Sequence, residues 1–71
     1  MADSVYRVTE VIGTSDQGWE AAARNAVSTA AASVRDLRVA EVLEQDVVIE
    51  DGQIKTFRTK LAISFKYGTD G

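Results

Sequence analysis

The feature that most limits how this chain can fold is a pair of long strand-like segments, residues 38–50 and 53–67, separated only by Asp51 and Gly52. Apolar and polar side chains alternate along much of both segments, which is typical of strands with one face against a core. Asp-Gly is the strongest two-residue signal for a type I′ hairpin, because this turn requires a positive φ at both central positions. The second half of the chain is therefore predicted to be one long antiparallel hairpin.

The two segments differ in how apolar their second faces are. In residues 53–67, one face is predicted to carry Phe57, Leu61, Ile63, Phe65 and Tyr67, with Thr59 among them. In residues 38–50, valine and leucine occupy positions on both faces. We therefore expect something besides this chain's own core to cover the second face: a partner, an ion or a bound organic molecule.

The first half of the chain is predicted to contain one strand and one helix. Residues 4–13 are rich in β-branched side chains, and Gly13 is expected to end this strand. Thr14 and Gln17 have the spacing of a capping box, in which each side chain bonds the other residue's backbone N–H. A helix is therefore expected to begin near residues 15–16.

An amphipathic helix is predicted from this start to Val34. Its apolar positions recur at three- and four-residue steps and are Trp19, Ala22, Ala23, Ala26, Val27, Ala30, Ala31 and Val34. Most of them are alanine, which permits close approach to a sheet but buries little area each, at about 25 cal/mol per Å². Trp19, on the same stripe, is expected to contact the core or a neighbouring subunit.

The order of elements predicts an α+β fold, β-α-β-β, with a three-stranded antiparallel sheet partly wrapped around one helix. It forms a single domain over residues 1–71, with an ordered core at about 4–67. One helix can cover only one face of such a sheet. Domains this small usually need disulfides, a metal or oligomerisation to add to a core worth about 3–5 kcal/mol, and the chain has no cysteine. We therefore expect a homo-oligomer.

Composition argues against several classes of function. The net charge of −3, without a lysine or arginine cluster, argues against a nucleic-acid partner. Residues 1–8 have no apolar leader, and no run of about 18 apolar residues occurs, so export and membrane spanning are not indicated and a cytoplasmic location is expected. Histidine and cysteine are absent, and no nucleophilic triad or glycine-rich phosphate loop is recognisable. We expect a protein that is not an enzyme.

The sequence also resembles a known family. The opening YRVTEVIGTS at 6–15, the AEV at 40–42, the hairpin and the order of elements together resemble the dodecins over residues 5–67. The resemblance implies a hollow homododecamer whose helices face outward and whose sheets line the interior. Most dodecins bind flavins between tryptophans, with a glutamine of the last strand bonding the ring edge, and they store the cofactor rather than turn over a substrate.

Two positions that match the flavin pocket of the family differ here. The stacking tryptophan corresponds to Val39 or its immediate neighbour, and the glutamine corresponds to Arg58. Valine has no π face, and arginine offers donors only, where an amide offers a donor and an acceptor. Val39 and Arg58 are therefore the cofactor-binding positions by resemblance, and we expect them not to support flavin binding in this chain.

The calcium dodecin branch of the family is more similar. Its members share a GTS…W start of the helix, an RVA in place of the tryptophan stretch, an EQD and an SFK. Here these are residues 13–15 with Trp19, then 38–40, 44–46 and 64–66. This resemblance implies a calcium site in place of the flavin site.

Glu44 and Asp46 are the candidate metal ligands. They are two residues apart on a strand, so both project from one face, and symmetry copies could add to the six to eight oxygens that calcium prefers. The alternative is a solvated or salt-bridged strand face opposite Arg58 and Lys60. Arg58 itself is expected to pair with Glu41 or Glu44, or else to bind an anionic ligand.

Together these observations predict a dodecameric small-ligand binding and storage protein whose partner is itself. Its ligand is expected to be calcium or another divalent cation rather than flavin. Two alternatives remain open from the sequence: a dodecin that binds and buffers riboflavin or FMN, and a structural particle without a specific ligand.

Overall fold

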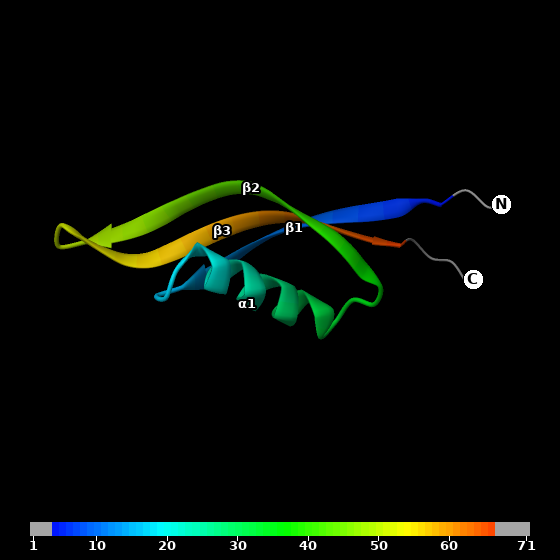
Figure 1. The fold of residues 1–71 in the computed structure, drawn as a ribbon, viewed down its shortest axis with the longest axis horizontal. Coiled ribbons are helices and arrows are strands. Elements are labelled where there is room, and N and C mark those ends of the chain that lie inside the picture. The colour runs from blue at the N-terminus through cyan, green and yellow to red at the C-terminus, as the bar shows by residue number, and fades with distance from the viewer. Residues whose placement is uncertain (1–3, 67–71) are drawn as a thin grey trace.

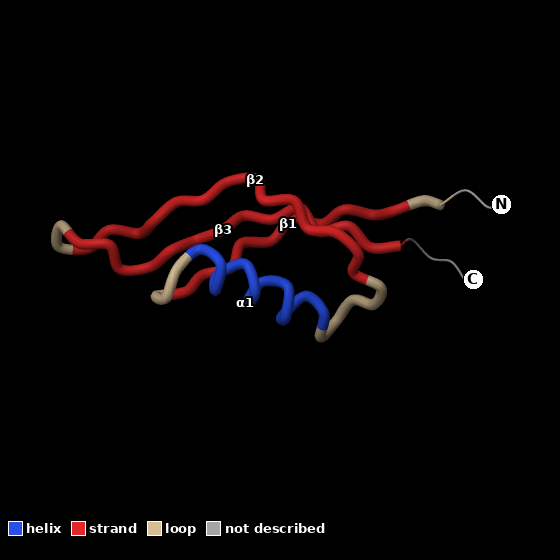
Figure 2. The backbone as a smooth tube through the Cα atoms, in the orientation of Figure 1, coloured by secondary structure: helices blue, strands red, loops and turns tan. Residues whose placement is uncertain are grey.

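A computed structural model of the chain describes residues 4–66 and contains one helix and three strands (Figures 1 and 2). The elements are β1 (Tyr6–Ser15), α1 (Trp19–Ala31), β2 (Leu37–Glu50) and β3 (Gln53–Lys66). The strands form one antiparallel sheet in the order β1-β3-β2, so the last strand lies in the centre. The predicted β-α-β-β fold is confirmed. Tyr67, predicted on the apolar face of the last strand, lies outside the described residues.

The predicted hairpin joins β2 and β3. Glu50 pairs with Gln53, and the two residues between them have positive φ, 52° at Asp51 and 75° at Gly52. Both values suit a type I′ turn, and aspartate and glycine are among the residues that adopt this conformation at low cost. Figure 1 shows the turn extending beyond the part of the sheet that α1 covers.

The start of the helix differs from the prediction. Gly13 does not end the strand but lies inside β1, and α1 begins at Trp19 after Gly18, without a side-chain capping bond. The capping box of Thr14 and Gln17 is therefore wrong, as is a helix start near residues 15–16. Thr14 is held in β1 by its pairing with Arg58. The helix also ends earlier than predicted, at Ala31 rather than Val34.

Glycine is needed at position 13 because the helix lies almost against the strand there. A Cβ at this position would lie 2.0 Å from the carbonyl oxygen of Ala22 and 2.8 Å from Cβ of Ala26. Real side chains do not approach so closely, so α1 would have to move away. The alanine stripe and Gly13 together set the short distance between α1 and β1.

The core lies between α1 and one face of the sheet. Its buried apolar side chains are Ala22 and Ala26 of α1 with Leu61 and Ile63 of β3. Thr59 is also fully buried, and its Oγ1 donates a hydrogen bond of 2.9 Å to the carbonyl oxygen of Trp19. The start of the helix is thus tied to the middle of the central strand. No helix within residues 4–66 is long and apolar enough to cross a membrane.

The opposite side of the sheet, which we call the open face, is not covered by any described element. It exposes apolar side chains from all three strands: Tyr6, Val8, Ile12, Val39, Val48, Ile49 and Ile54. Val39 and Ile49 are each 63% exposed. The predicted lack of cover over the second face of the sheet is therefore confirmed for the single chain.

Irregular pairing in β2 explains why its apolar residues do not alternate strictly. The register shifts between Val42 and Glu44, and again near each end of the strand. A shift of one residue moves all following side chains to the other face. The extra residue, Leu43, therefore places Glu44 and Asp46 on the open face, the same face as Val39.

Candidate functional site

The candidate site is a small pocket in the middle of the open face. It has a volume of about 220 Å³ and is lined by Ile12 of β1, Glu44 and Asp46 of β2, and Arg58 and Lys60 of β3. The sheet register brings these residues together, because Glu44 pairs with Lys60 and Asp46 pairs with Arg58. The prediction that both acids share a face is confirmed.

Asp46 and Arg58 form a two-pronged ion pair across the strands. Nε of Arg58 donates to Oδ1 of Asp46 and Nη2 donates to Oδ2, both at 2.7 Å. The hydrogen bonds from Arg58 hold the pKa of Asp46 below its usual value, and the same contacts raise the pKa of Arg58. Both side chains are nearly half exposed, at 42% for Arg58 and 46% for Asp46.

The predicted partners of Arg58, Glu41 and Glu44, are wrong. The extra residue in β2 places Asp46 rather than either glutamate directly across from Arg58. The salt-bridged strand face, which was the alternative to a metal site, is present for this pair. Glu44 acts on Arg58 only through its charge, as a minor cause of the raised pKa of Arg58.

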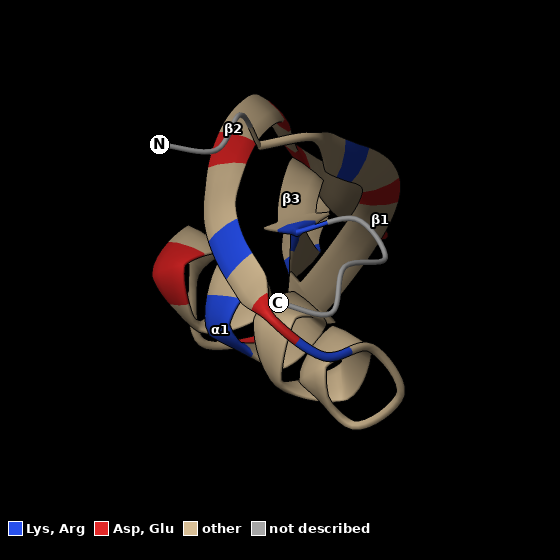
Figure 3. Ribbon diagram, turned by 90° about the vertical axis from the view of Figure 1, so that its right-hand side faces the viewer, with Lys and Arg blue, Asp and Glu red and all other residues tan. Residues whose placement is uncertain are grey.

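Glu44 has no hydrogen bond or ion pair with any residue in the range 4–66. Its cross-strand neighbour Lys60 instead contacts Glu10 on the other side of β3, at 3.5 Å from Nζ to Oε1. The pocket therefore contains one free carboxylate, that of Glu44, and one that is held, that of Asp46. Acidic and basic positions both occur along the sheet and on α1 (Figure 3).

Trp19 reaches the same site from the other side of the sheet. Its Nε1 donates a hydrogen bond of 3.0 Å to the carbonyl oxygen of Asp46, and its ring packs edge-on against Phe57 at 5.2 Å between centroids. The prediction of a core contact for Trp19 is confirmed. Its bond to Asp46 was missed, since no local sequence signal links residues 27 positions apart. Asp46 is thus held by its side chain on one face and by its backbone from the other.

The two flavin-pocket positions do not meet within one chain. Val39 pairs with Ser64, six residues along β3 from Arg58. Six residues of strand span roughly 20 Å. A ligand that contacted both positions at once would need more than one copy of the chain.

Carboxylates are ligands that a hard cation prefers, but Arg58 and Lys60 line the same pocket, and one chain supplies too few oxygens. Calcium takes six to eight oxygens, and Glu44 and Asp46 provide at most four. Across residues 4–66, no three or more acidic, histidine or cysteine side chains gather where they could hold a metal ion. A complete calcium site at this position requires oxygens from neighbouring copies or from water.

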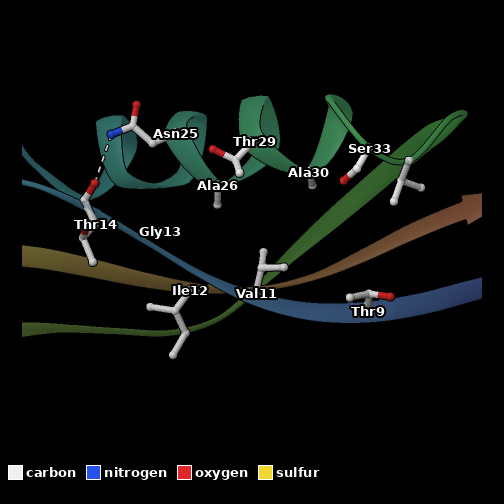
Figure 4. Close-up of a pocket in the computed structure, with 11 residues that line it drawn as sticks. Thr9, Val11, Ile12, Gly13, Thr14, Asn25, Ala26, Thr29, Ala30 and Ser33 are labelled. Atoms are coloured by element: carbon white, nitrogen blue, oxygen red, sulfur yellow. Dashed lines mark hydrogen bonds between the residues drawn. The ribbon is translucent and has the colours of Figure 1, made fainter.

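A larger groove, of about 660 Å³, lies between α1 and the edge strand β1 (Figure 4). Small and hydroxyl-bearing residues line it, among them Gly13, Ala26, Thr29 and Ser33, and no charged side chain does. At one end, Nδ2 of Asn25 donates to the carbonyl oxygen of Thr14 at 3.0 Å. The groove therefore lacks the charges that a metal ion or a phosphate would need.

Comparison with known proteins identifies the family. The family model described as dodecin matches residues 5–68. This chain belongs to the dodecin family. A protein named calcium dodecin from Mycobacterium tuberculosis is 51% identical over 63 residues, which cover 89% of each chain. The resemblance to dodecins, and to the calcium dodecin branch in particular, is confirmed.

Solved dodecin structures have the same fold. The structure of a dodecin from Streptomyces coelicolor superposes with a TM-score of 0.91 at 40% identity, covering 99% of this chain and 100% of that one. A crystal structure of calcium dodecin from Mycobacterium tuberculosis, described as calcium chelating with a novel calcium-binding site, superposes with a TM-score of 0.81 at 49% identity. That match covers 96% of this chain and 97% of the other.

Proposed function

We propose that this dodecin assembles from twelve copies into a hollow particle that binds and stores calcium or another divalent cation and has no enzymatic activity. The observation that carries the proposal is the 51% identity to a calcium dodecin over nearly the whole chain. At this similarity, homologous chains normally keep the same fold and the same surfaces between copies.

The open face supports assembly. It displays seven large apolar side chains, whereas the buried apolar core within residues 4–66 consists of four residues, two of them alanine. At about 25 cal/mol per Å² of apolar surface removed from water, covering this face with sister subunits would stabilise the chain considerably. Small domains without disulfides commonly depend on such contacts.

The pocket on the same face supports cation binding. Glu44 and Asp46 present carboxylate oxygens, the ligand type that calcium prefers, toward the side of the sheet where copies would meet. We propose these two residues as ligands contributed by each subunit, with copies and waters completing the coordination. Glu44 is the more available of the two, because Asp46 is bonded to Arg58.

Flavin binding finds less support. Val39 offers no aromatic platform, and stacking on such a platform is worth about 1–3 kcal/mol per base in nucleic-acid complexes. Arg58 is already engaged with Asp46 and cannot present an acceptor to a ring edge. The one tryptophan, Trp19, has its indole N–H bonded to Asp46 from the helix side of the sheet.

The test combines native mass spectrometry of freshly isolated protein with calorimetric titration by calcium chloride and by riboflavin. We expect twelve copies and calcium binding, which the double variant Glu44→Gln with Asp46→Asn should weaken at least tenfold. Glu20→Gln is a matched control, since Glu20 is an acid on the exposed side of α1 paired with Arg24.

Calcium binding by the double variant at full strength would contradict the assignment of ligands. Riboflavin binding without calcium binding would identify a flavin dodecin, and binding of neither would favour the structural particle.

A further inference from the structure

The two edges of the sheet differ in how they are protected. The edge formed by β2 is interrupted by shifts of register at residues 37–39, 42–44 and 48–49. Such bulges bend a strand and commonly protect an edge against pairing with another chain. The edge formed by β1 instead pairs with β3 in unbroken register from Tyr6 to Ser15, and the chain has no proline. The β1 edge is therefore the one to which a further strand can be added.

Two contacts show which backbone groups of β1 point outward. At one end, the carbonyl oxygen of Thr14 accepts a bond from the side chain of Asn25, so it faces away from β3. At the other end, Lys66 is the partner of Tyr6 and donates its backbone N–H to the carbonyl oxygen of Asp36, away from β1. In an antiparallel ladder, both residues of such a pair direct their backbone groups away from each other. The N–H and C=O groups that reach the outer edge of β1 are therefore those of residues 6, 8, 10, 12 and 14.

The groove beside this edge has the shape and the lining to hold an extended strand. It lies between β1 and α1, and Asn25, Thr29 and Ser33 line it at four-residue steps, so their polar groups form one row (Figure 4). Within residues 4–66, neither a strand nor a side chain bonds the outward groups of residues 8, 10 and 12. An added strand would find both backbone partners and a polar wall.

We propose that the outer edge of β1 pairs with the same edge of a second copy, antiparallel and about a two-fold axis beside Thr9. This inference rests on the proposed assembly and names one of its contacts. A second copy is the occupant because the apolar open face already requires association of copies, and this pairing joins the open faces of two chains into one surface. Two-fold contacts are also the commonest between identical chains.

Asn25 sets the register of the pairing. Its side chain occupies the carbonyl oxygen of Thr14, so the outward groups left for a partner strand belong to residues 6–12. The centre of this range is Thr9, and a two-fold axis there lets every outward residue exchange both backbone bonds with the other copy. An axis at Glu10 would instead place two glutamates directly opposite each other, which destabilises a sheet.

The side chains opposed in this register are compatible. Tyr6 lies opposite Ile12 of the other copy, and Val8 lies opposite Glu10. Tyr6 and Ile12 are 47% and 51% exposed in the single chain, and an aromatic residue opposite a β-branched one stabilises a sheet. No two like charges are directly opposed. The pairing therefore covers apolar surface without a charge conflict.

The decisive experiment compares Glu10→Pro with Glu10→Ala by native mass spectrometry and sedimentation velocity over a dilution series. Proline removes a backbone N–H that points to the outer edge, and it leaves the bonds between β1 and β3 in place. We expect Glu10→Pro to keep the far-UV circular dichroism of Glu10→Ala and to dissociate from twelve copies at a concentration at least about tenfold higher. Thr9→Pro removes an N–H that points to β3, and should lose the strand structure as well.

The charge at position 8 gives a second test that does not depend on proline. Val8 is 61% exposed and lies opposite Glu10 of the other copy in the proposed register. Val8→Lys places a cation there and Val8→Glu a second anion, while both lose the same apolar side chain. We expect Val8→Glu to dissociate at a concentration about tenfold higher than Val8→Lys, with both variants folded by circular dichroism.

The outcomes separate this inference from the proposed function. If the unmodified protein has twelve copies and a folded Glu10→Pro dissociates at the same concentration as Glu10→Ala, the β1 pairing is overturned and the assembly stands. The edge would then be open to an extended segment of another protein. Folded single chains of the unmodified protein would overturn both. If Glu10→Pro does not fold, equal dissociation of Val8→Lys and Val8→Glu overturns the pairing.

Discussion

The two faces of the sheet in this small dodecin differ in composition and in burial. The face against α1 carries the buried core, with Leu61 1% and Ile63 3% exposed. The open face mixes charged and apolar side chains, and Val39 remains 63% exposed on it. The comparison shows that the chain's own buried core lies on one face, whereas the apolar side chains of the other face have no cover within the described residues.

The largest effect should come from the covered face at Gly13. The variant Gly13→Val introduces a Cβ that would lie 2.0 Å from the carbonyl oxygen of Ala22. Because this atom belongs to the helix backbone and cannot rotate away, we expect a loss of about 3 kcal/mol or more in the free energy of unfolding. Denaturant titration at fixed protein concentration measures this loss.

Gly52→Asn is a suitable control, since a Cβ there meets nothing within 4 Å and asparagine tolerates positive φ. This variant should lose less than about 1 kcal/mol in the free energy of unfolding.

A cavity in the covered face should have the next largest effect. Leu61→Ala removes a buried side chain of the central strand, and we expect a loss of about 3 kcal/mol. Val39→Ala on the open face should leave the secondary structure intact and act on assembly, because Val39 has no cover within the chain. Far-UV circular dichroism and sedimentation velocity distinguish these effects. Equal losses of secondary structure in both variants would remove the distinction between the faces.

Loss of the hydrogen bond between Trp19 and Asp46, which connects the two faces of the sheet, should have a smaller effect. Trp19→Phe keeps an aromatic ring against Phe57 but loses the hydrogen bond to the carbonyl oxygen of Asp46. We expect the free energy of unfolding to fall by about 1 kcal/mol, the usual net value of one hydrogen bond. A loss of more than twice this size would mean that phenylalanine does not preserve the packing of the indole ring.

The smallest effect should be the pH dependence of the ion pair on the open face. Arg58 lowers the pKa of Asp46, so the folded protein holds the ionised form more strongly than the unfolded chain does. The resulting stability is present above the unfolded pKa, near 3.8, and is lost as the pH falls through the lower folded value. Melting temperatures of the unmodified protein and of Asp46→Asn should therefore differ near neutral pH and converge in acid. A difference that stays the same from neutral pH into acid strong enough to protonate Asp46 in the folded protein would exclude the ion pair as its cause.

Much of the covered face could be predicted from the sequence, because its signals are local. Alternation along β3 identified Leu61 and Ile63 as buried, and Asp51 with Gly52 identified the turn. The helix start was predicted wrongly because a strand pairing overrides local capping signals. Thr14 is paired with Arg58 across the sheet and is not free to cap α1.

The open face was less predictable because its arrangement depends on register. Both acids were correctly placed on one face, yet the partner of Arg58 was not, since the extra residue in β2 cannot be read from the alternation of side chains alone. The bond between Trp19 and Asp46 depends on how α1 approaches the edge of β2, which no short motif encodes. The alternation of side chains along one chain does not identify which residues meet between copies.

The most direct test of the central claim, that sister subunits cover the open face, is sedimentation velocity of the purified protein at low micromolar concentration with circular dichroism on the same sample. We predict one folded species with the mass of twelve chains. Folded single chains, with the sheet intact and the open face in water, would contradict the claim and remove the basis for a cation site between copies.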